Sequence, residues 1–389
     1  SSIKRVTSMA HQKEKLVSLA RRLLNHNLNG TTDQADEIMI KPVSDYIDKS
    51  LIKSEVNKIF YDHPVPIALS AELKENNSYK ATKAIDTPIL VTRDKDGIVR
   101  AFINICKHRG APVCSEGSGN KSRFSCTYHG WMYDNKGQLI NIFKSDTFGD
   151  IDTTKIKLTE LFCEERSGFI WVCLNPDIRY NLDEWMDGFD KELDDIDLKN
   201  WHIFSSIKLD GPRWKICWDG YLDGYHHHMV HPDTVGKNTI VNLIAHDTFG
   251  PHQRFAFGLK NINELSRIEE KDWEPENHLR LIHSVFPNSS ISAIQNQHCL
   301  ISIVFPTPDL QGTITNQYIL CLKEPETDEE IKEAEDFSKL ALTAIEDEDY
   351  PMNFMIQDSI ESKANTEFMF GKNEPIQQHY HHWVDKLSK

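Results

Sequence analysis

Alternating apolar and polar positions predict a group of short strands between about residues 64 and 174. Residues 87–93 and 98–105 are rich in β-branched side chains, and an Asp-Lys-Asp-Gly turn separates them. Residues 131–133 and 138–142 flank a second turn with the same Asp-x-x-Gly pattern. Residues 168–174 lack charged positions and predict a buried strand. Together these runs predict a small all-β domain.

The regions before and after these strands have a different pattern of apolar and polar residues. Residues 1–55 read as a polar helical segment, with an apolar stripe through Leu16, Leu19, Ala20, Leu23 and Leu24. After the turn residues 175–177, the pattern predicts a helix over about 214–230, strands near 290–294, 299–305 and 313–322, an acidic helix over about 327–349 and a last helix near 375–387. The expected fold class is α+β. The expected divisions are a helical segment (1–55) that packs on the larger domain, the all-β domain (56–178) and the larger domain (179–389).

Composition narrows the possible partners. The 389 residues carry a formal net charge of −15, which argues against binding to nucleic acid. No apolar run approaches the length that spanning a bilayer requires, and no secretory signal is visible, so we expect no membrane partner and a cytoplasmic location. In such a chain, the eight cysteines read as reduced thiols or metal ligands.

Two Cys-and-His pairs lie on short loops of the expected all-β domain. Cys106 and His108 form the first pair, and Cys126 and His129 form the second. Two thiolates and two imidazoles suit either a zinc ion or an iron–sulfur cluster. A Rieske cluster needs two cysteines on one iron and two histidines on the other, and one Cys with one His on each loop can supply both sets. Zinc in a structural knuckle is the alternative.

The residues around these pairs carry a family resemblance. The segment N-I-C-K-H-R-G-A from Asn104 and the segment C-T-Y-H-G-W from Cys126 resemble the two halves of the Rieske motif in ring-hydroxylating oxygenase α subunits. The resemblance implies that Cys106 and Cys126 hold one iron of a 2Fe–2S cluster and that His108 and His129 hold the other. It also implies a Rieske domain of antiparallel sheets with two metal-binding hairpin loops. The larger domain would then be catalytic, a helix-grip-like antiparallel sheet with covering helices.

A second histidine cluster lies in the segment 214–233. It contains His226, His227, His228 and His231 among aromatic residues. Helix geometry alone would pair His227 with His231, which are four residues apart. The order Asp223, His226, His231 is instead similar to the D-x-Y-H-x₄-H signature of the same family, in which the two histidines bind mononuclear Fe(II). A separation of five predicts a wide turn or a helix end there, with His227 and His228 as neighbours of the site or core residues.

The third ligand of a two-histidine, one-carboxylate site should lie far along the chain. The acidic run 346–349 reads as a solvated helix face, whereas Asp358 lies in an apolar setting. In the family, Glu often follows the carboxylate ligand at the third position and Gln at the seventh. Here Glu361 fits that pattern and Asn365 departs from it. Asp358 is therefore the predicted ligand.

Asp223 receives a separate role from the resemblance. In the family, an Asp at this position bonds the iron-ligating histidine and, across a subunit interface, a histidine of the neighbouring Rieske cluster. We therefore expect Asp223 to be catalytically important, to fix the tautomer of His226 and to carry electrons between subunits. This arrangement implies a head-to-tail ring, and we expect a homotrimer, with a β subunit left open.

The resemblance implies an iron-dependent oxygenase that uses O2 as co-substrate. No nicotinamide or flavin fingerprint is visible, since the Gly-Ser-Gly at 117–119 does not open a helix, so NADH or NADPH would act indirectly through a separate ferredoxin or reductase. The expected reaction is hydroxylation or cis-dihydroxylation of a small aromatic or other hydrophobic ring substrate. Oxidative O- or N-demethylation by a Rieske monooxygenase is the alternative. Outside enzymes, a Rieske electron carrier would be much shorter, and a zinc protein would be colourless.

Overall fold

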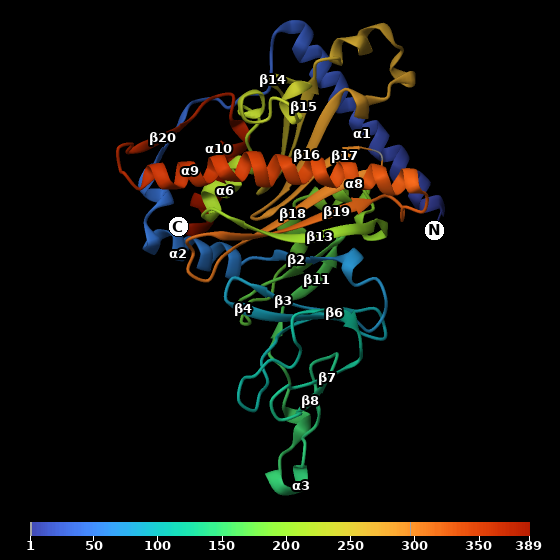
Figure 1. Cartoon of the computed structure of the whole chain (residues 1–389), viewed down its shortest axis with the longest axis vertical. Helices are drawn as coiled ribbons and strands as arrows, with labels where there is room; N and C mark the ends of the chain where they lie inside the picture. Colours follow the sequence, from blue (N-terminus) through green and yellow to red (C-terminus); the bar gives the residue numbers. More distant parts are fainter. Residues whose placement is uncertain (1, 296) are drawn as a thin grey trace. The chain divides into compact units, whose positions relative to one another are not determined.

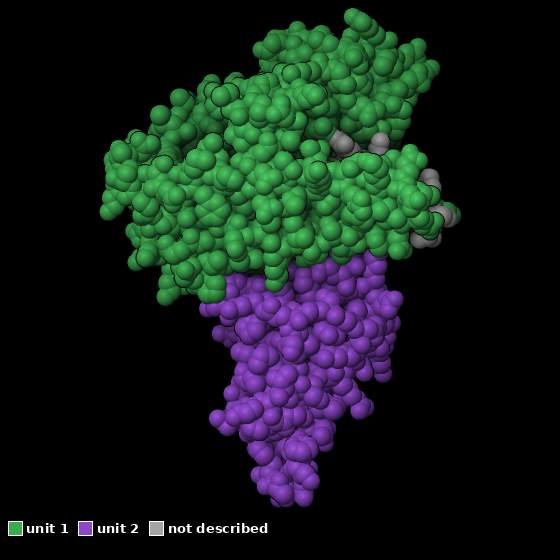
Figure 2. Space-filling view, in the orientation of Figure 1, with its two compact units in different colours: residues 1–59, 185–389 green, residues 60–184 purple. Residues whose placement is uncertain are grey.

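The computed structural model describes residues 2–295 and 297–389. Within it the chain forms two compact units, one of residues 1–59 and 185–389 and the other of residues 60–184 (Figure 2). Each unit is built around antiparallel sheets. No helix among the described residues has the length and apolar character that crossing a membrane requires.

Residues 60–184 form an all-β unit of three sheets (Figure 1). The five-stranded sheet has the order β10 (Glu160–Leu161), β5 (Val99–Ile103), β4 (Thr87–Arg93), β3 (Ser78–Ala84), β6 (Gly117–Asn120). The three-stranded sheets are β11 (Cys163–Arg166), β12 (Phe169–Val172), β2 (Val65–Leu69), and β7 (Arg123–Ser125), β8 (Met132–Asp134), β9 (Leu139–Asn141). The short α3 (Ser145–Phe148) follows β9.

The two Asp-x-x-Gly turns fold as the sequence predicts and for the same reason. Asp94 accepts hydrogen bonds from the backbone N–H groups two and four residues later, and Asp134 does the same in the second turn. Gly97 and Gly137 adopt positive φ angles of 81° each, which glycine tolerates without strain. Both predicted hairpins are confirmed, and so is the buried strand β12, all of whose residues are buried.

The second unit contains one seven-stranded antiparallel sheet. Its strands lie in the order β13 (His202–Gly211), β19 (Thr313–Cys321), β18 (His298–Pro306), β17 (Ser289–Gln295), β16 (Leu279–Val285), β15 (His252–Leu259), β14 (Thr239–Phe249). A separate two-stranded sheet joins β1 (Met39–Pro42) to β20 (Glu367–Phe370). The predicted strands after residue 290 are confirmed.

Helices cover both faces of this sheet. The described helices of this unit are α1 (Ser2–Asn29), α2 (Lys49–Val56), α4 (Leu182–Met186), which begins in the other unit, α5 (Phe189–Asp194), α6 (Trp214–Tyr221), α7 (His227–Val230), α8 (Asp328–Leu342), α9 (Tyr350–Ile360) and α10 (Pro375–Ser388). A π-helical segment, η10 (Thr343–Asp349), joins α8 to α9. The apolar stripe of α1 packs through Leu19 and Leu23 on Leu279 and Leu281 of β16. On the other face, α8 contacts β18, where His298 stacks on Phe337.

One predicted helix is interrupted. The aromatic pattern predicts a helix over 214–230, but α6 ends at Tyr221 and α7 begins only at His227. Asp223 therefore lies in a loop, not in mid-helix. Its side chain accepts hydrogen bonds from the backbone N–H groups of Tyr225 (2.6 Å) and His226 (3.2 Å), which stabilises the turn between the two helices.

Candidate metal centres

The two Cys-and-His loops of the all-β unit share one backbone conformation. In the first, the N–H of Cys106 donates to the carbonyl of Ala111 (2.8 Å) and its carbonyl accepts from Gly110 (3.0 Å). In the second, the Cys126 N–H donates to the carbonyl five residues later (2.8 Å), and the Cys126 carbonyl accepts from the glycine four residues later (3.0 Å). Both glycines have positive φ, Gly110 at 86° and Gly130 at 72°. The sequence thus builds two matching fingers, each with one Cys and one His.

The thiols of the two fingers are buried next to each other. Cys106 is 3% exposed and Cys126 is 5% exposed. Burial raises the pKa of the Cys106 thiol, the nearby Cys126 adds to the rise, and a hydrogen bond from Tyr133 opposes it. The Tyr133 hydroxyl lies 3.3 Å from Cys106 Sγ and accepts from the Lys107 N–H at 3.0 Å. Two buried thiols with a hydroxyl beside one sulfur fit a metal cluster that needs thiolate ligands.

The imidazoles of the two fingers face each other. Nδ1 of His108 lies 3.1 Å from Nδ1 of His129. The ring of His108 stacks on Trp131, with centroids 4.9 Å apart and planes at 17°. Two nitrogen donors on one tetrahedral ion with bonds near 2.1 Å lie about 3.4 Å apart. The two cysteines thus lie together and the two histidines lie together. This arrangement fits a Rieske cluster, in which one iron binds two sulfur ligands and the other binds two nitrogen ligands.

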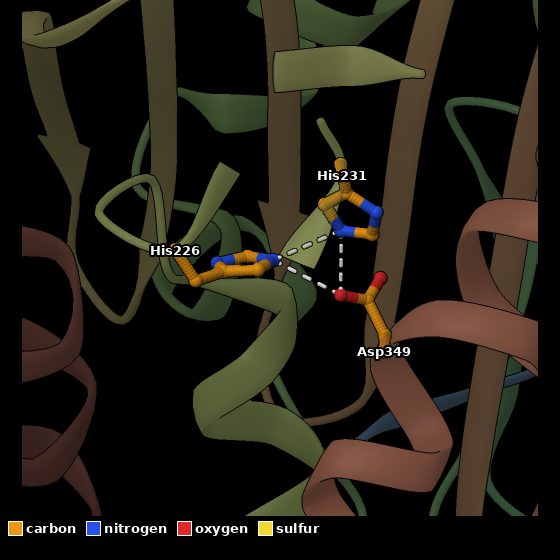
Figure 3. A group of neighbouring side chains, drawn as sticks. All are labelled: His226, His231 and Asp349. Carbon is orange, nitrogen blue, oxygen red and sulfur yellow. Dashed lines mark hydrogen bonds and ion pairs between the residues drawn. The ribbon is translucent and has the colours of Figure 1, made fainter. Parts of the chain in front are cut away.

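A second constellation lies in the other unit, where the structure brings together His226, His231 and Asp349 (Figure 3). Nε2 of His226 is 3.1 Å from Nε2 of His231. Oδ1 of Asp349 lies 3.0 Å from the first nitrogen and 2.7 Å from the second. Two imidazoles and one carboxylate that converge on one point form the donor set of a facial triad, which suits Fe(II) and leaves open coordination positions.

Each imidazole of this triad also meets a carboxylate at its other nitrogen. Nδ1 of His231 lies 3.1 Å from Oε1 of Glu348, which also accepts from the Thr234 hydroxyl at 2.8 Å. Nδ1 of His226 lies 3.3 Å from Oδ1 of Asp223. With a cation bound between the three groups, carboxylates beside Nδ1 would favour the proton there and leave both Nε2 atoms as metal donors. Three electron-rich atoms in such close contact fit a bound cation.

The charges of the site favour a cation as well. Burial by itself would lower the pKa of His226, but Asp223 and Asp349 outweigh burial and raise it to about 10. Burial would likewise raise the pKa of Asp349, and the hydrogen bonds and charges of the two histidines lower it instead. The negative surroundings that favour a proton on His226 would favour a metal ion at the same place.

The local backbone explains how residues five apart converge. α7 is a single helical turn, and His231 follows it with the non-helical angles φ −120° and ψ 49°. The direction of its ring is therefore not set by the helical periodicity. Gly236 packs on this turn, and a Cβ there would lie 2.0 Å from the carbonyl oxygen of His227. Only glycine fits that contact. The predicted helix end is confirmed, and the wide π-type turn lies instead in η10, which ends at Asp349.

The carboxylate of the triad differs from the predicted one. Asp358 is exposed on α9 and does not belong to this group, and the nearby Glu361 pairs with Arg213. The prediction of Asp358 is therefore corrected to Asp349. The acidic run is solvated only in its first half, because Glu346 and Asp347 are exposed while Glu348 and Asp349 turn toward the histidines. The spacing could have indicated that Asp349 faces the interior, because it follows the buried Ala341 and Ile345 at intervals of four.

The remaining histidines of the cluster lie beside the triad. The ring of His227 packs edge-on against Phe257, with centroids 5.2 Å apart, and Nε2 of His228 donates to the carbonyl of Thr239 at 2.7 Å. Burial, together with the nearby His226 and His231, lowers the pKa of His227 to about 3. A neutral His227 packed on an aromatic ring serves as part of the wall around the site.

Family models match both regions just described. The model of the Rieske [2Fe-2S] domain matches residues 63–153, and the model of the ring hydroxylating alpha subunit (catalytic domain) matches residues 198–389. The chain belongs to the Rieske non-heme iron oxygenases. It therefore contains a Rieske 2Fe–2S domain and the catalytic domain that binds mononuclear iron in this family of oxidoreductases, and the predicted α+β fold class is confirmed.

Curated relatives of this Rieske oxygenase include enzymes of two reaction types. The chain is 31% identical to the toluate 1,2-dioxygenase subunit alpha of Pseudomonas putida over 48% of this chain and 43% of the relative. It is 27% identical to the anthranilate 1,2-dioxygenase large subunit of Burkholderia cepacia (62% and 65%) and 26% identical to the carnitine monooxygenase oxygenase subunit of Acinetobacter baumannii (60% and 63%). The matched part spans less than two thirds of each relative's length.

Solved structures agree on the fold over most of the chain. A quaternary ammonium Rieske monooxygenase in complex with L-carnitine superimposes with a TM-score of 0.77 at 21% identity, covering 92% of this chain and 97% of that one. Naphthalene 1,2-dioxygenase from Rhodococcus sp. bound to indole gives a TM-score of 0.72 at 20% identity, covering 96% and 98%. At these identities the likeness concerns the fold.

Proposed function

We propose that this chain is the terminal oxygenase component of a multicomponent Rieske oxygenase, which hydroxylates or cis-dihydroxylates an aromatic or other hydrophobic ring substrate. The observation that carries the proposal is the presence of two separate ligand sets in one chain. Cys106, His108, Cys126 and His129 would hold the 2Fe–2S cluster, and His226, His231 and Asp349 would hold Fe(II). Only an enzyme that stores an electron at one site and uses it at another needs both sets.

The residues around the mononuclear site have different roles in the proposed reaction. When bound there, Fe(II) supplies open positions for O2, and the reduced cluster supplies the additional electron that oxygen activation requires. Glu348, at hydrogen-bond distance from Nδ1 of His231, and Asp223, 3.3 Å from Nδ1 of His226, would favour protons on the Nδ1 atoms and so keep both Nε2 atoms available as donors. His231, 2% exposed, lies in a largely water-free setting, so its bond to Asp349 is weakly screened.

Asp223 has a second part in the proposal. Its side chain remains 27% exposed although it contacts His226, so one edge of the carboxylate is available to another group. We propose that this edge meets a Rieske histidine of a neighbouring subunit and carries electrons between the two centres. A head-to-tail homotrimer would satisfy that geometry in each subunit, and a β subunit could accompany it. NADH or NADPH would supply electrons through a ferredoxin or reductase, and we place the enzyme in the cytoplasm.

Oxidative demethylation is the second candidate reaction. The named relatives support both possibilities, because they include aromatic 1,2-dioxygenases and a carnitine monooxygenase. Dioxygenation places both oxygen atoms in the product, whereas monooxygenation places one there and releases the other as water. The two reactions therefore differ in a quantity that can be counted.

Turnover under ¹⁸O2 tests the proposal. The purified protein, with a heterologous ferredoxin and reductase and NADH, is incubated with a panel of aromatic and trimethylammonium compounds, and products are analysed by mass spectrometry. Two labelled atoms indicate dihydroxylation. One labelled atom in a phenol, an alcohol or a released aldehyde indicates monooxygenation. If the iron-replete, fully reducible protein never incorporates label or consumes O2, the proposal fails.

A further inference from the structure

Successive residues of β16 point to opposite faces of the seven-stranded sheet. On β16, Leu279 and Leu281 point to the face that α1 covers, where they join an apolar cluster. Side chains alternate along a strand, so Arg280 points to the other face. That face meets the helices of the iron site, since the hydroxyl of Tyr350, next to Asp349, bonds Thr315 of β19 at 2.5 Å. Arg280 therefore belongs to the side of the sheet that faces the metal-binding helices.

The position of Arg280 within that face is close to the triad. In the β15–β16 register it lies directly opposite Phe257, and paired side chains of an antiparallel ladder share one face. The ring of Phe257 packs against the ring of His227 and fills the space beside Gly224, where a Cβ would lie 2.2 Å from Cε1 of Phe257. Arg280 is thus separated from the histidine loop by a single aromatic ring.

The guanidinium of Arg280 meets no acidic side chain within the described residues. Among the described residues it makes no hydrogen bond and no ion pair. Other arginines of this unit are paired, for example Arg254 with Glu192 and Asp247, and Arg213 with Glu361. Burial lowers the pKa of Arg280, and no acidic group offsets that effect. Arg280 is only partly buried, so its donors meet solvent rather than a protein acceptor and are free to bind an external ligand.

The rest of this face supplies no counter-charge. The register places Ile282 and Ser284 beside Arg280 on β16, and Ser290 and Ser292 on the neighbouring β17. Within residues 2–295 and 297–389, no Asp or Glu of the seven strands alternates onto this face. Ile282 and Ser292, which are directly paired, stay partly exposed under the helices, whereas Ser284 and Ser290 are buried. Solvent thus reaches the sheet next to Arg280, while the deeper part of the same face is closed.

We propose that Arg280 binds a carboxylate of the substrate, so that the enzyme acts on an organic acid whose apolar part extends past Phe257 toward the iron site. Arginine is suited to this task, because its planar fork binds both oxygens of a carboxylate at once. Phe257 and Ile282 would contact the apolar part of the molecule. This inference rests on the proposed function only where it says that the substrate extends toward an iron site. The binding of an acid at Arg280 does not depend on the proposed function.

Matched acids and amides test the inference by binding rather than by turnover. Isothermal titration calorimetry under anaerobic conditions would measure benzoate against benzamide, 2-naphthoate against 2-naphthamide, and 4-methylvalerate against its amide. We expect at least one acid to bind roughly ten- to a hundredfold more tightly than its amide. In Arg280→Gln that preference should disappear while binding of the amide is unchanged, and Arg280→Lys should keep part of it. Arg267→Gln, at an exposed position of the same unit, is the matched control.

Each outcome bears on one of the two proposals. If no acid of the panel binds more tightly than its amide, or if Arg280→Gln retains the preference, the inference about Arg280 is overturned. Circular dichroism and iron content of each variant report folding, and Arg280→Lys provides the second reading if Arg280→Gln does not fold. A protein that prefers acids but lacks mononuclear iron would refute the proposed function alone. A protein with both metal centres and no preference would refute the inference alone.

Discussion

Glu348 Oε1 lies 3.1 Å from Nδ1 of His231, on the side of the ring opposite Asp349. The adjacent residues Glu348 and Asp349 thus contact the two nitrogens of one imidazole, Asp349 at Nε2 and Glu348 at Nδ1. The π-helical segment that ends at Asp349 makes this possible, because its wider turn changes the directions of successive side chains. Glu348 therefore holds the His231 ring in the orientation in which its Nε2 faces Asp349.

Replacement of Glu348 should weaken iron binding without removing a ligand. We expect Glu348→Ala to reduce the affinity for Fe(II) roughly ten- to a hundredfold, because His231 loses the acceptor that fixes its tautomer. Glu348→Gln keeps an oxygen acceptor and should retain most of the affinity. Competition with a chelator measures the effect, and Glu346→Gln, at an exposed position of the same segment, is the control. Equal affinity in Glu348→Ala and the wild type would remove Glu348 from the site.

The choice between Asp349 and Asp358 has a direct test. Asp349→Ala should remove roughly one iron per chain and leave the visible spectrum of the cluster intact, since the cluster ligands lie in the other unit. Asp358→Ala should change neither quantity, because Asp358 is exposed. Iron analysis with absorption spectroscopy of both variants decides the point. Loss of iron in Asp358→Ala alone would restore the original prediction.

Asp223 should affect electron transfer more than metal content. Asp223→Ala is expected to keep both metal centres largely bound while it slows reoxidation of the reduced cluster at least tenfold, because the carboxylate contacts His226 without being one of the three ligands. Stopped-flow absorption of the cluster during a single turnover measures the rate. Asp233→Asn, at an exposed position nearby, is the control. Unchanged rates with unchanged coupling to product would contradict the bridging role.

Acid should destabilise the catalytic unit through His252. This residue is 0% exposed, Nε2 donates to the carbonyl of Trp185 (3.0 Å) and Nδ1 accepts from the Phe286 N–H (3.0 Å), so the folded ring has no site for a second proton. Burial lowers the pKa of His252 to about 3, against about 6.5 in the unfolded chain. Between these values the unfolded state binds more protons, so stability falls as pH falls from about 6.5 toward 3, by about 1.4 kcal/mol per pH unit.

Denaturant unfolding at pH 7.5 and pH 5 measures this effect. His252→Gln should be less stable at pH 7.5 because its packing is imperfect, but its further loss on acidification should be smaller than the wild-type loss by about 2 kcal/mol. His11→Gln, whose side chain is 55% exposed, should follow the wild type. An identical acid-induced loss in His252→Gln and the wild type would show that other groups account for it.

Local patterns predicted much of this molecule. The Asp-x-x-Gly turns could be foreseen because one Asp side chain bonds two N–H groups of its own turn, and no distant contact is needed. The two Cys-and-His fingers could be foreseen for a similar reason, since each ligand pair lies within four residues. The family model of the Rieske domain covers both fingers.

The carboxylate at the mononuclear site could not be placed in the same way. Asp349 lies 118 residues from His231, and only the folded sheet and helices bring them together. The run of acidic residues around Asp349 resembles a solvated helix face, whereas the apolar neighbours of Asp358 suggested burial that α9 does not provide. The interval of four that links Asp349 to Ala341 and Ile345 suits the wider π-helical turn, whereas the 3.6-residue period of an α-helix does not single it out. The prediction erred where side-chain direction depends on this irregular backbone.

Iron and sulfide analysis of anaerobically purified protein, together with electron paramagnetic resonance, shows whether the chain holds two distinct kinds of iron centre. We predict roughly three irons and two acid-labile sulfides per chain, together with the signal of a reduced cluster ligated by both cysteine and histidine. We also predict a separate ferrous centre that nitric oxide makes visible and that Asp349→Ala abolishes. Zinc in place of iron, or a single kind of iron centre in the wild type, would contradict this prediction.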